Sequence, residues 1–407
     1  MPGIGDGGET NGVPVRAGEA RLLGGIDPRR VLEEETGRAF PGAVLLVRSR
    51  GQDRLVAATG WTAEEGTGAV RAQVTPDTLF DVASLTKAIG LMPVALALAA
   101  EGRLDLSAPV GRYLSWTRDR WIGAVTTDLL LRHASGLAAW RPYGPEFCAE
   151  RGLSSAGTPG AREYLRRRLA SEEPESPPGT ACVYSDLGYL VAQEVCEAAG
   201  GAPLDVLFRQ RVAGPLGLVR TSFRPIRRGR AQPLSPGEAG TIAATECCPL
   251  RGRCLQGEVH DENAWVLGGV AGHAGLFSTA PETARIVQAL RDSWAGTRDW
   301  LPRDLLREAW DPGRRLPGST RLLGLDTPSP SGSLAGDRAP EGTAGHLGFT
   351  GTSFWVDLPG DAIVVLLSHR VHPTRNREGI REARRRIHDA CWDWIRGGQG
   401  DRDARLL

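Results

Sequence analysis

Four strand-like segments constrain the fold of this chain, because they lie near its two ends and leave a long middle section between them. Residues 42–50 (GAVLLVRSR) and 54–61 (RLVAATGW) form one pair, and residues 351–358 (GTSFWVDL) and 362–370 (AIVVLLSHR) form another, each split by a turn signal. Residues 100–300 carry mainly helical patterns and loops rich in proline and glycine. We therefore expect an α/β fold of the α+β type: an antiparallel sheet built from both termini, flanked by helices, with an inserted, mostly helical subdomain.

The length of 407 residues is sufficient for one large domain with a substantial core. Amphipathic patterns predict helices near residues 29–35 and over residues 375–395, and Pro93 should bend the helix that contains it. The expected boundaries are a flexible tail over 1–18, a single domain over 19–396 with an α/β part at about 19–100 and 300–396 and a helical part at about 101–299, and a C-terminal tail over 397–407.

Charge and composition argue against nucleic-acid and membrane partners. The net charge is +1, and the arginines near the C-terminus alternate with apolar residues as on the polar face of a helix. The longest apolar run, 88–100, is too short to cross a bilayer, and the start of the chain lacks the regions of a signal peptide. Seven cysteines without framework spacing fit a reducing compartment. We expect a cytoplasmic protein, and the sequence carries no signal for an oligomeric state.

Lys87 is the only lysine of the chain, since the other 48 of its 49 Lys and Arg residues are arginines. Arginine replaces lysine at most surface sites but cannot act as a base, whereas a desolvated amine can be pushed toward neutrality near pH 7. Ser84 lies three residues earlier, and this spacing places both side chains on one helical face. Ser84 and Lys87 are therefore candidates for a nucleophile and its base, although a serine here is also a common N-cap.

These residues form the motif Ser84-x-x-Lys87, which resembles the first motif of the serine β-lactamase and penicillin-binding protein superfamily. Tyr184-Ser185-Asp186 resembles the Tyr-x-Asn of class C β-lactamases and their esterase relatives, and His346-Leu347-Gly348 resembles the Lys-Thr-Gly triplet in its His-x-Gly form, directly before a strand. Residues 129–137 (LLLRHASGL) and the segment around HDENAWVLGGVAGHAG also resemble this superfamily. The resemblance covers about residues 30–395 and implies a β-lactamase/transpeptidase-like fold.

The resemblance implies a serine hydrolase that forms an acyl-enzyme on Ser84 with a small-molecule acyl substrate and no cofactor. Lys87 and Tyr184 would move the proton, and the backbone N–H groups of Ser84 and Phe349 would hold the oxyanion. His346 would orient the substrate. The implied site consists of Ser84, Lys87 and Tyr184 as catalytic residues, and Asp186, His346, Gly348 and Phe349 at the substrate and oxyanion positions.

Two departures from the motifs affect the expected substrate. Asp186 stands where the family has asparagine, so it cannot donate an amide hydrogen bond, and it should stabilise the charged form of Lys87. His346 stands where many relatives have lysine, and we expect it to gain its proton between pH 8 and 6. Both changes point to esters or other uncharged acyl groups, with esterase-like or weak β-lactamase activity. D-Ala-D-Ala carboxypeptidase activity and a non-catalytic fold for ligand sensing are the alternatives.

Other patterns have weaker functional meaning. A metal-dependent hydrolase is an alternative interpretation of the sequence. The candidate metal ligands are His260, Asp261, Glu262, His273, His369 and His372. Their spacing matches no strong zinc motif, so we predict no metal site. We expect His133 and His273 to be structural. Cys247, Cys248 and Cys254 lack a second Cys-x-x-Cys half and should be free thiols. No Gly-x-Ser-x-Gly elbow and no nucleotide-binding loop is present.

Overall fold

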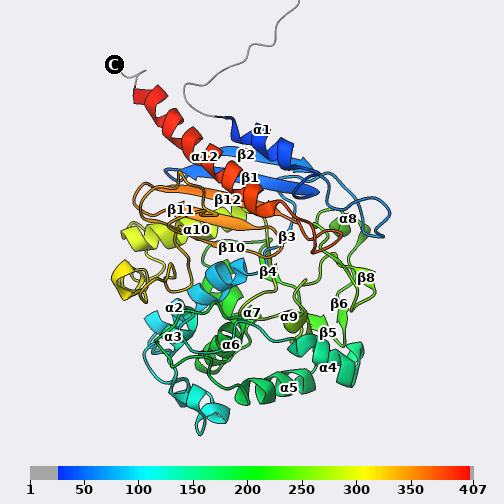
Figure 1. Cartoon of the computed structure of the whole chain (residues 1–407), viewed down its shortest axis with the longest axis vertical. Coiled ribbons are helices and arrows are strands. Elements are labelled where there is room, and N and C mark those ends of the chain that lie inside the picture. The colour runs from blue at the N-terminus through cyan, green and yellow to red at the C-terminus, as the bar shows by residue number, and fades with distance from the viewer. Residues whose placement is uncertain (1–25, 404–407) are drawn as a thin grey trace, which may run out of the picture.

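The computed structural model describes residues 26–403 and has a sheet at one end and a mostly helical region at the other (Figure 1). The sheet has five antiparallel strands in the order β10-β11-β12-β1-β2. Two strands near the N-terminus thus join three from the C-terminal part of the chain, which confirms the predicted fold class. The strands are β1 (Gly42–Ser49), β2 (Gln52–Gly60), β10 (Thr343–Leu347), β11 (Ser353–Asp357) and β12 (Ala362–Ser368).

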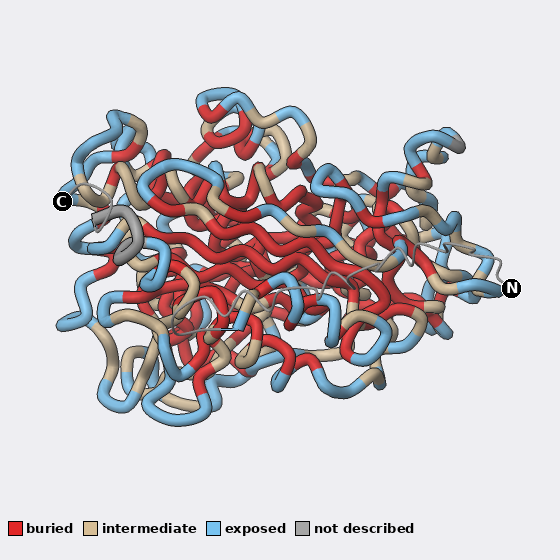
Figure 2. Tube along the Cα trace, turned by 90° about the horizontal axis from the view of Figure 1, so that it is seen from above, coloured by how far each residue is buried: buried red, intermediate tan, exposed pale blue. Residues whose placement is uncertain are grey.

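The centre of the sheet is the β1–β12 pair, in which Ala43–Ser49 face Ala362–Ser368 in register. Both strands are almost entirely buried, as their near-continuous aliphatic sequences require. Figure 2 shows these buried strands crossing the middle of the molecule, with exposed chain at the periphery. The segment β10 was not predicted as a strand, because it is short and contains Gly345, and glycine is depleted in strands. His346 and Leu347 therefore end a strand, and a turn over 348–352 leads into β11.

Helices cover both faces of the sheet. On the outer face, α1 (Pro28–Glu35) and α12 (Ile380–Asp403) pack together over β1 and β11, through residues such as Leu32 and Trp392. On the inner face, α10 (Ala280–Ala295) packs against β12 and β1 through residues such as Ile286. This corrects the expected division at residue 300, because α10 lies within the predicted helical part yet belongs to the sheet layer.

The C-terminal helix starts and ends later than predicted. It begins at Ile380 instead of residue 375, because Gly379 has a φ of +93° and Arg375 is held by ion pairs away from the helix. It continues to Asp403, through the first residues of the expected C-terminal tail. The predicted N-terminal tail over 1–18 lies outside the described residues.

The helical region contains the buried helix α2, which directly follows the segment that carries Ser84. Residues Thr86–Leu91 form a π-helical stretch that continues directly into α2, of which Pro93 is the second residue. The chain changes from π-helical to α-helical geometry at Met92, directly before Pro93, and the bend predicted there stays a prediction. Other elements are α2 (Met92–Ala100), α3 (Thr127–Leu131), α4 (Tyr143–Arg151), α5 (Pro159–Ala170), α6 (Asp186–Gly200), α7 (Leu204–Phe208), α8 (Pro236–Ala239), α9 (Glu262–Val266), α11 (Arg303–Ala309), β3 (Phe80–Asp81), β4 (Ser222–Phe223), β5 (Ile226–Arg227), β6 (Arg230–Ala231), β7 (Cys247–Cys248), β8 (Arg253–Cys254) and β9 (Leu276–Ser278).

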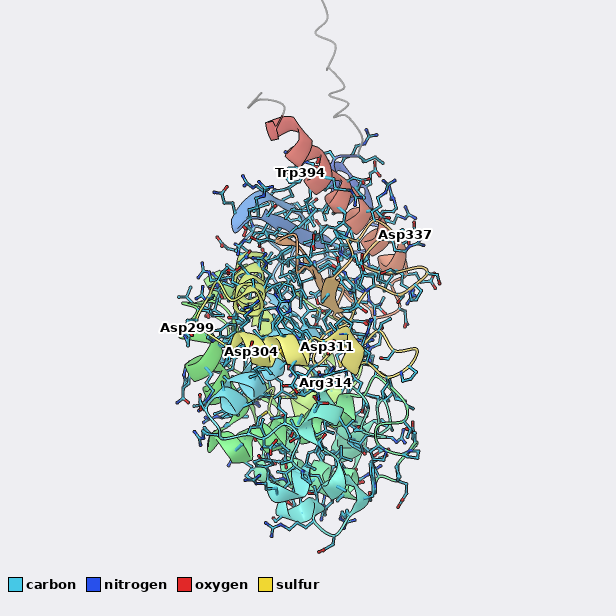
Figure 3. The ribbon with its side chains drawn as sticks, turned by 90° about the vertical axis from the view of Figure 1, so that its left-hand side faces the viewer. Asp299, Asp304, Asp311, Arg314, Asp337 and Trp394 are labelled. Atoms are coloured by element: carbon cyan, nitrogen blue, oxygen red, sulfur yellow. The ribbon has the colours of Figure 1, made fainter. Side chains whose placement is uncertain are left out.

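The two regions are joined at the side of the molecule by the band of chain that contains α11. Figure 3 shows Asp304, Asp311 and Arg314 along this band, between the sheet and the helical region. Behind it, the Arg132 guanidinium from α3's C-terminus donates a hydrogen bond to the Ala309 carbonyl (3.0 Å). Within residues 26–403, no helix has the length and apolar character needed to span a membrane.

Candidate active site

Ser84 lies in a tight turn between β3 and the π-helical stretch. Its neighbour Ala83 has a φ of +47°, which is uncommon for a residue with a Cβ atom. The buried Asp81 carboxylate holds this turn by accepting the N–H groups of Ala83 (2.8 Å) and His260 (2.7 Å). Burial raises the pKa of Asp81, so these two bonds offset part of the cost of its charge. The turn thereby presents Ser84 at the wall of a cavity.

The Lys87 side chain is completely buried beneath Ser84 and has three polar partners. Its ammonium nitrogen lies 3.1 Å from Ser84 Oγ, 2.7 Å from Asp186 Oδ1 and 3.2 Å from the His273 carbonyl oxygen. Burial alone would lower the pKa of Lys87, but Asp186 and Tyr184 outweigh it and raise the pKa above its usual value. The predicted contact with Ser84 is present, and the raised pKa agrees with the expectation that Asp186 stabilises the charged form of Lys87. The role of Lys87 as a base stays a prediction.

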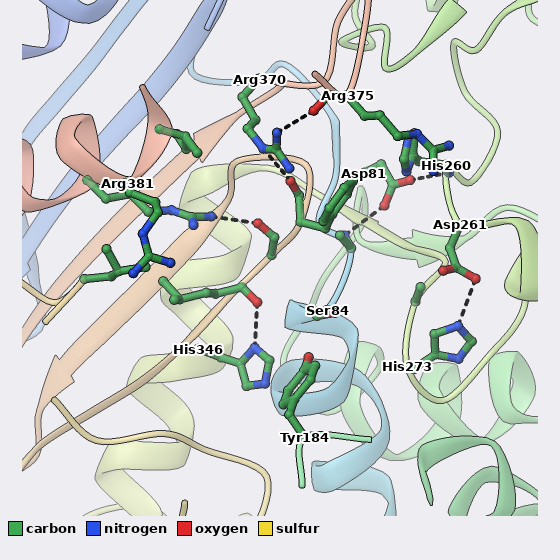
Figure 4. Close-up of a pocket in the computed structure, with 18 of the residues that line it drawn as sticks. Asp81, Ser84, Tyr184, His260, Asp261, His273, His346, Arg370, Arg375 and Arg381 are labelled. Carbon is green, nitrogen blue, oxygen red and sulfur yellow. Dashed lines mark hydrogen bonds and ion pairs between the residues drawn. The ribbon is translucent and has the colours of Figure 1, made fainter. Parts of the chain in front are cut away.

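Tyr184 is positioned by histidine and arginine side chains that surround its ring. The Ser185 N–H donates to His133 Nδ1 (3.0 Å), and the His133 ring centroid lies 4.5 Å from that of Tyr184. Lys87 Nζ and Arg321 Cζ each lie 4.8 Å from the Tyr184 ring centroid. Figure 4 shows the Tyr184 hydroxyl directed toward the segment that carries Ser84. The structural role predicted for His133 is confirmed, since it is buried and anchors the second motif.

The turn of the third motif is fastened to the segment just before Ser84. Thr350 donates its hydroxyl to the Asp81 carbonyl (2.8 Å), and Thr352 donates to the Val82 carbonyl (3.0 Å). A Cβ atom on Gly348 would lie 2.0 Å from Thr352 Oγ1 and 2.6 Å from the Val82 oxygen. Glycine is therefore required at position 348 for the turn to approach Ser84 this closely.

The backbone N–H groups of Ser84 and Phe349 belong to two residues that line the same cavity. Among residues 26–403, neither Ser84 N nor Phe349 N donates a hydrogen bond to another protein group. Such a pair of free donors is what an oxyanion requires. The Phe349 ring is 49% exposed and stacks on His260 with ring centroids 5.6 Å apart.

His346 differs from the expectation that it gains a proton between pH 8 and 6. It is buried, its Nδ1 lies 2.9 Å from the Leu347 carbonyl, and burial together with the charges of Arg321 and Lys87 lowers its pKa well below 6.5. The imidazole therefore stays neutral throughout that pH range. Its Nε2 is buried and has no partner among the described residues, so it is available to a ligand.

A cavity of about 1020 Å³ brings the predicted residues together (Figure 4). Six of the seven line it, and Lys87 lies directly behind Ser84; the six are Ser84, Tyr184, Asp186, His346, Gly348 and Phe349. Sequence reasoning missed six arginines that also line the cavity, which are Arg321, Arg370, Arg375, Arg377, Arg381 and Arg384. Nothing in the sequence could separate them from the many other arginines.

The histidines considered as metal ligands are occupied by other groups. His369 contacts the carbonyl oxygens of Ala244 (2.7 Å) and Trp61 (2.9 Å), and His372 contacts that of Thr245 (2.6 Å). Asp186, Asp261 and His273 do place ligand atoms within 4.8 Å of one another. However, Asp186 is paired with Lys87, and His273 with Asp261 (2.9 Å), as its predicted structural role requires.

The cysteine-rich segment is a short hairpin of β7 and β8, with Cys247 opposite Cys254. All of its thiols are free, as predicted. Its neighbour Glu246 accepts hydrogen bonds from Arg375 at the cavity wall.

Comparison with known proteins identifies the family to which this architecture belongs. A family model described as Beta-lactamase matches residues 29–389. The N-acetylmuramyl-L-alanine amidase of Bacillus subtilis (strain 168) is 30% identical over 371 residues, which cover 84% of this chain and 80% of the amidase. The chain belongs to the beta-lactamase family. It is accordingly a hydrolase of the serine beta-lactamase fold.

Two further proteins are similar to this beta-lactamase family member. A protein of Escherichia coli O157:H7 named "Putative D-alanyl-D-alanine carboxypeptidase" is 28% identical over 392 residues, covering 89% of this chain and 86% of that protein. Among solved structures, EstCE1, described as a hydrolase with promiscuous acyltransferase activity, has a TM-score of 0.67 and 20% identity, covering 90% of this chain and 97% of EstCE1. The latter similarity supports the fold alone.

Glu246→Gln should reveal how strongly the cavity wall of this beta-lactamase family member depends on charge. Burial would raise the pKa of Glu246, but hydrogen bonds from His260 and Arg375 lower it to about 2. A lowered pKa stabilises the fold above the unfolded-state pKa, and that stabilisation is lost as pH falls toward about 2. We expect the variant to lose roughly 2–3 kcal/mol in the free energy of unfolding at pH 7. Urea unfolding of wild type and Glu246→Gln at pH 7 and pH 3 measures this difference in the free energy of unfolding.

The difference between wild type and Glu246→Gln should shrink at pH 3. Glu341→Gln is the matched control, because Glu341 is exposed and the chemical change is identical. It should stay within about 0.5 kcal/mol of wild type. An equal loss at both pH values would show that packing, not charge, explains the effect of Glu246→Gln.

Proposed function

We propose that the chain hydrolyses small acyl substrates through an acyl-enzyme on Ser84. The observation that carries this proposal is the contact of a buried ammonium with a serine hydroxyl (3.1 Å) at the wall of a large cavity. A buried cation placed against a serine at the end of a helical segment stabilises negative charge where a nucleophile would act. The free N–H groups of Ser84 and Phe349 support the same assignment.

The proton would follow a relay through Tyr184. As Ser84 Oγ attacks the carbonyl carbon, its proton passes to the Tyr184 hydroxyl oxygen, and Tyr184 passes its own proton to the leaving group. Lys87 remains an ammonium and stabilises the negative charge that develops along this path. The oxyanion is held by the N–H groups of Ser84 and Phe349 until the leaving group departs. In the second half, a water molecule attacks the acyl-enzyme, and the relay runs back to Ser84.

Esters, lactams and peptide amides are all compatible with this chemistry. Carboxypeptidase or amidase activity is the second candidate, favoured by the names of the two bacterial relatives and by the arginines in the cavity. A non-catalytic sensing role is less well supported, because Ser84 lines an accessible cavity and is in contact with the buried Lys87 ammonium behind it.

A substrate panel with mass detection tests the proposal. p-Nitrophenyl acetate, nitrocefin and a peptide ending in D-Ala-D-Ala are each mixed with the protein, and turnover is followed with intact-protein mass spectrometry after acid quenching. We expect turnover of at least one substrate and an acyl adduct on the peptide that contains Ser84. Absence of turnover and adduct with all three would favour the sensing role.

Asp186→Asn should change the pH dependence of the reaction. In wild type, Asp186 opposes the effect of burial and keeps the pKa of Lys87 raised. Without that carboxylate, burial lowers the pKa of Lys87, and the ammonium is lost at a lower pH. We expect the alkaline limb of the kcat/KM profile to move down by roughly one to three pH units, since buried lysines show shifts of that size. The measurement is kcat/KM for the best panel substrate between pH 6 and 10.

Asp326→Asn is the matched control for Asp186→Asn. Asp326 also lines the cavity but pairs with Arg321 (3.2 Å) and makes no hydrogen bond or ion pair with Lys87. Its pH profile should keep its alkaline limb. A rise in the activity of Asp186→Asn above pH 8 would mean that the neutral amine is the working form and that Lys87 is the base.

A further inference from the structure

The β7–β8 hairpin places two cysteine side chains directly opposite each other. Cys247 of β7 faces Cys254 of β8 in the antiparallel ladder. The Leu255 N–H donates to the Glu246 carbonyl oxygen (2.9 Å), which is the bond that flanks a non-hydrogen-bonded pair. The Cys247 N–H donates to the Pro373 carbonyl oxygen (2.8 Å) and not to Cys254. The two cysteines therefore occupy the kind of ladder position at which facing side chains approach most closely.

This arrangement meets the geometric requirement for a disulfide. The Cα atoms of a non-hydrogen-bonded pair are about 4.5 Å apart, and disulfides form where this separation is about 4.4–6.8 Å. Directly opposite residues also share one face of the ladder, so the two thiols lie on the same side of the hairpin. A bond between the two sulfur atoms of Cys247 and Cys254 would thus need no large movement of the backbone.

These two thiols differ from most other cysteines of the described chain in exposure. Figure 1 shows β8 at the edge of the molecule, and both thiols are partly exposed, so a small oxidant can reach them. Burial, together with a hydrogen bond to the Cys247 thiol, raises the pKa of Cys254 to about 12. Cys254 therefore stays protonated at neutral pH, and Cys247 is the thiol that would attack first. The buried cysteines are Cys148, Cys196, Cys248 and Cys391.

A metal ion fits this site less well than a disulfide. The nearby His372 places its Nδ1 3.7 Å from Cys254 Sγ. Both nitrogens of its ring are already used, because Nδ1 contacts the Thr245 carbonyl oxygen (2.6 Å) and Nε2 accepts the Glu64 N–H (2.8 Å). Structural zinc takes four ligands, and within the described part of the chain the two thiols alone do not supply that set.

We propose that Cys247 and Cys254 form an intramolecular disulfide when the protein meets a small-molecule disulfide such as oxidised glutathione. The Cys247 thiolate attacks one sulfur of that oxidant, forms a mixed disulfide and releases one reduced thiol. Cys254 then attacks the Cys247 sulfur and releases the second. Each leaving thiolate takes up the proton that the attacking protein thiol gives up. The two protein thiols are thereby oxidised by two electrons, and the small disulfide is reduced by the same two.

The disulfide would act on the wall of the cavity, because Glu246 directly precedes Cys247. The Glu246 carboxylate contacts His260 Nε2 (3.1 Å) and accepts from Arg375 (2.6 Å), and both partners line the cavity. Closing the short loop between the two cysteines removes conformational freedom from the unfolded chain and from open forms of the hairpin. The oxidised protein should therefore hold Glu246 and its two partners more firmly than the reduced protein.

Peptide mapping tests the disulfide in the full chain. The protein is equilibrated under native conditions with an excess of oxidised over reduced glutathione, alkylated in denaturant and digested with trypsin. Cleavage after Arg251 and Arg253 puts Cys247 and Cys254 in separate peptides. We expect these two peptides to be joined, with a mass about 2 Da below the sum of the two reduced peptides, and to separate again after reduction.

Three single variants assign the bond to its two sulfur atoms. Cys247→Ser and Cys254→Ser should lose the joined peptides. Cys248→Ser is the matched control and should keep them, because Cys248 is buried and, as the next residue along the strand, points to the opposite face. Absence of the joined peptides in wild type, or their persistence in Cys247→Ser, would overturn the proposal.

Amide hydrogen exchange measures the effect on the cavity wall locally. Peptides from residues 245–260 should exchange severalfold more slowly in oxidised than in reduced wild type, whereas peptides from β1 should be unchanged. Cys247→Ser should show no difference between the two conditions. Equal exchange in wild type that is mapped as joined would overturn the effect on the wall. Neither measurement needs a substrate, so both results hold whether or not the acyl-transfer function at Ser84 is confirmed.

Discussion

Ser84→Ala is expected to reduce turnover by at least about 10⁴-fold, the scale seen when a serine nucleophile is removed. The fold should be retained, because the only hydrogen bond of Ser84 Oγ in the described structure is to Lys87 Nζ, which keeps Asp186 and the His273 carbonyl as partners. The residual rate would reflect the N–H groups and the cavity alone. The measurement is kcat for the best substrate of the panel, with thermal unfolding as a check on the fold.

A fluorophosphonate probe provides the matching labelling result for Ser84. Wild type should gain one covalent adduct, located on the peptide that contains Ser84, and Ser84→Ala should gain none. Ser135→Ala is a suitable control, because Ser135 is buried and its Oγ accepts from the Leu137 N–H (3.3 Å) without lining the cavity. An adduct on Ser135 or Ser185 would contradict the assignment of the nucleophile.

Lys87→Arg is expected to reduce kcat/KM by about 10²–10⁴-fold, the usual range for a group that assists proton transfer. The charge is retained, but the three partners of Lys87 Nζ lie around one point at 2.7–3.2 Å, and a planar guanidinium cannot place one nitrogen there in the same way. The Lys87 side chain is completely buried, so the larger guanidinium group of Lys87→Arg should also lower the free energy of unfolding by roughly 1–3 kcal/mol.

The Lys87→Arg measurement combines kcat/KM at pH 7 with urea unfolding. Activity is measured without urea, under conditions in which the variant is folded. Unfolding of the variant is then not mistaken for a loss of kcat/KM. Activity near that of wild type would show that any cation suffices at this position, and that the single lysine has no special role.

The sheet and the first motif were accessible from the sequence because both depend on local patterns. The aliphatic runs of β1 and β12 predict buried strands directly, and the spacing of Ser84 and Lys87 predicts the contact that the structure shows. In contrast, β10 was missed because its five residues include a glycine and carry little local preference.

The electrostatic state of the site could be predicted only where a motif resemblance named the partner. Asp186, 99 residues from Lys87, was expected to favour the charged amine, whereas the low pKa of His346 depends on burial and on Arg321, which no motif indicated. Likewise, Arg377 and Arg381 are four positions apart and look equivalent in sequence, yet within residues 26–403 only Arg377 has a carboxylate partner, Glu64 from the N-terminal part of the chain. Pairing of this kind emerges only when the fold brings the segments together.

The β1–β12 pairing also has a consequence for how the chain acquires its structure during synthesis. The central strand pair joins residues more than 300 positions apart, so the sheet cannot close until nearly the whole chain has left the ribosome. The Ser84 turn is fastened by Thr350 and Thr352, which are made equally late. A nascent or C-terminally truncated chain therefore holds Ser84 and Lys87 without the turn that contains Thr350 and Thr352, and the cavity around Ser84 is completed only when this late segment folds against it.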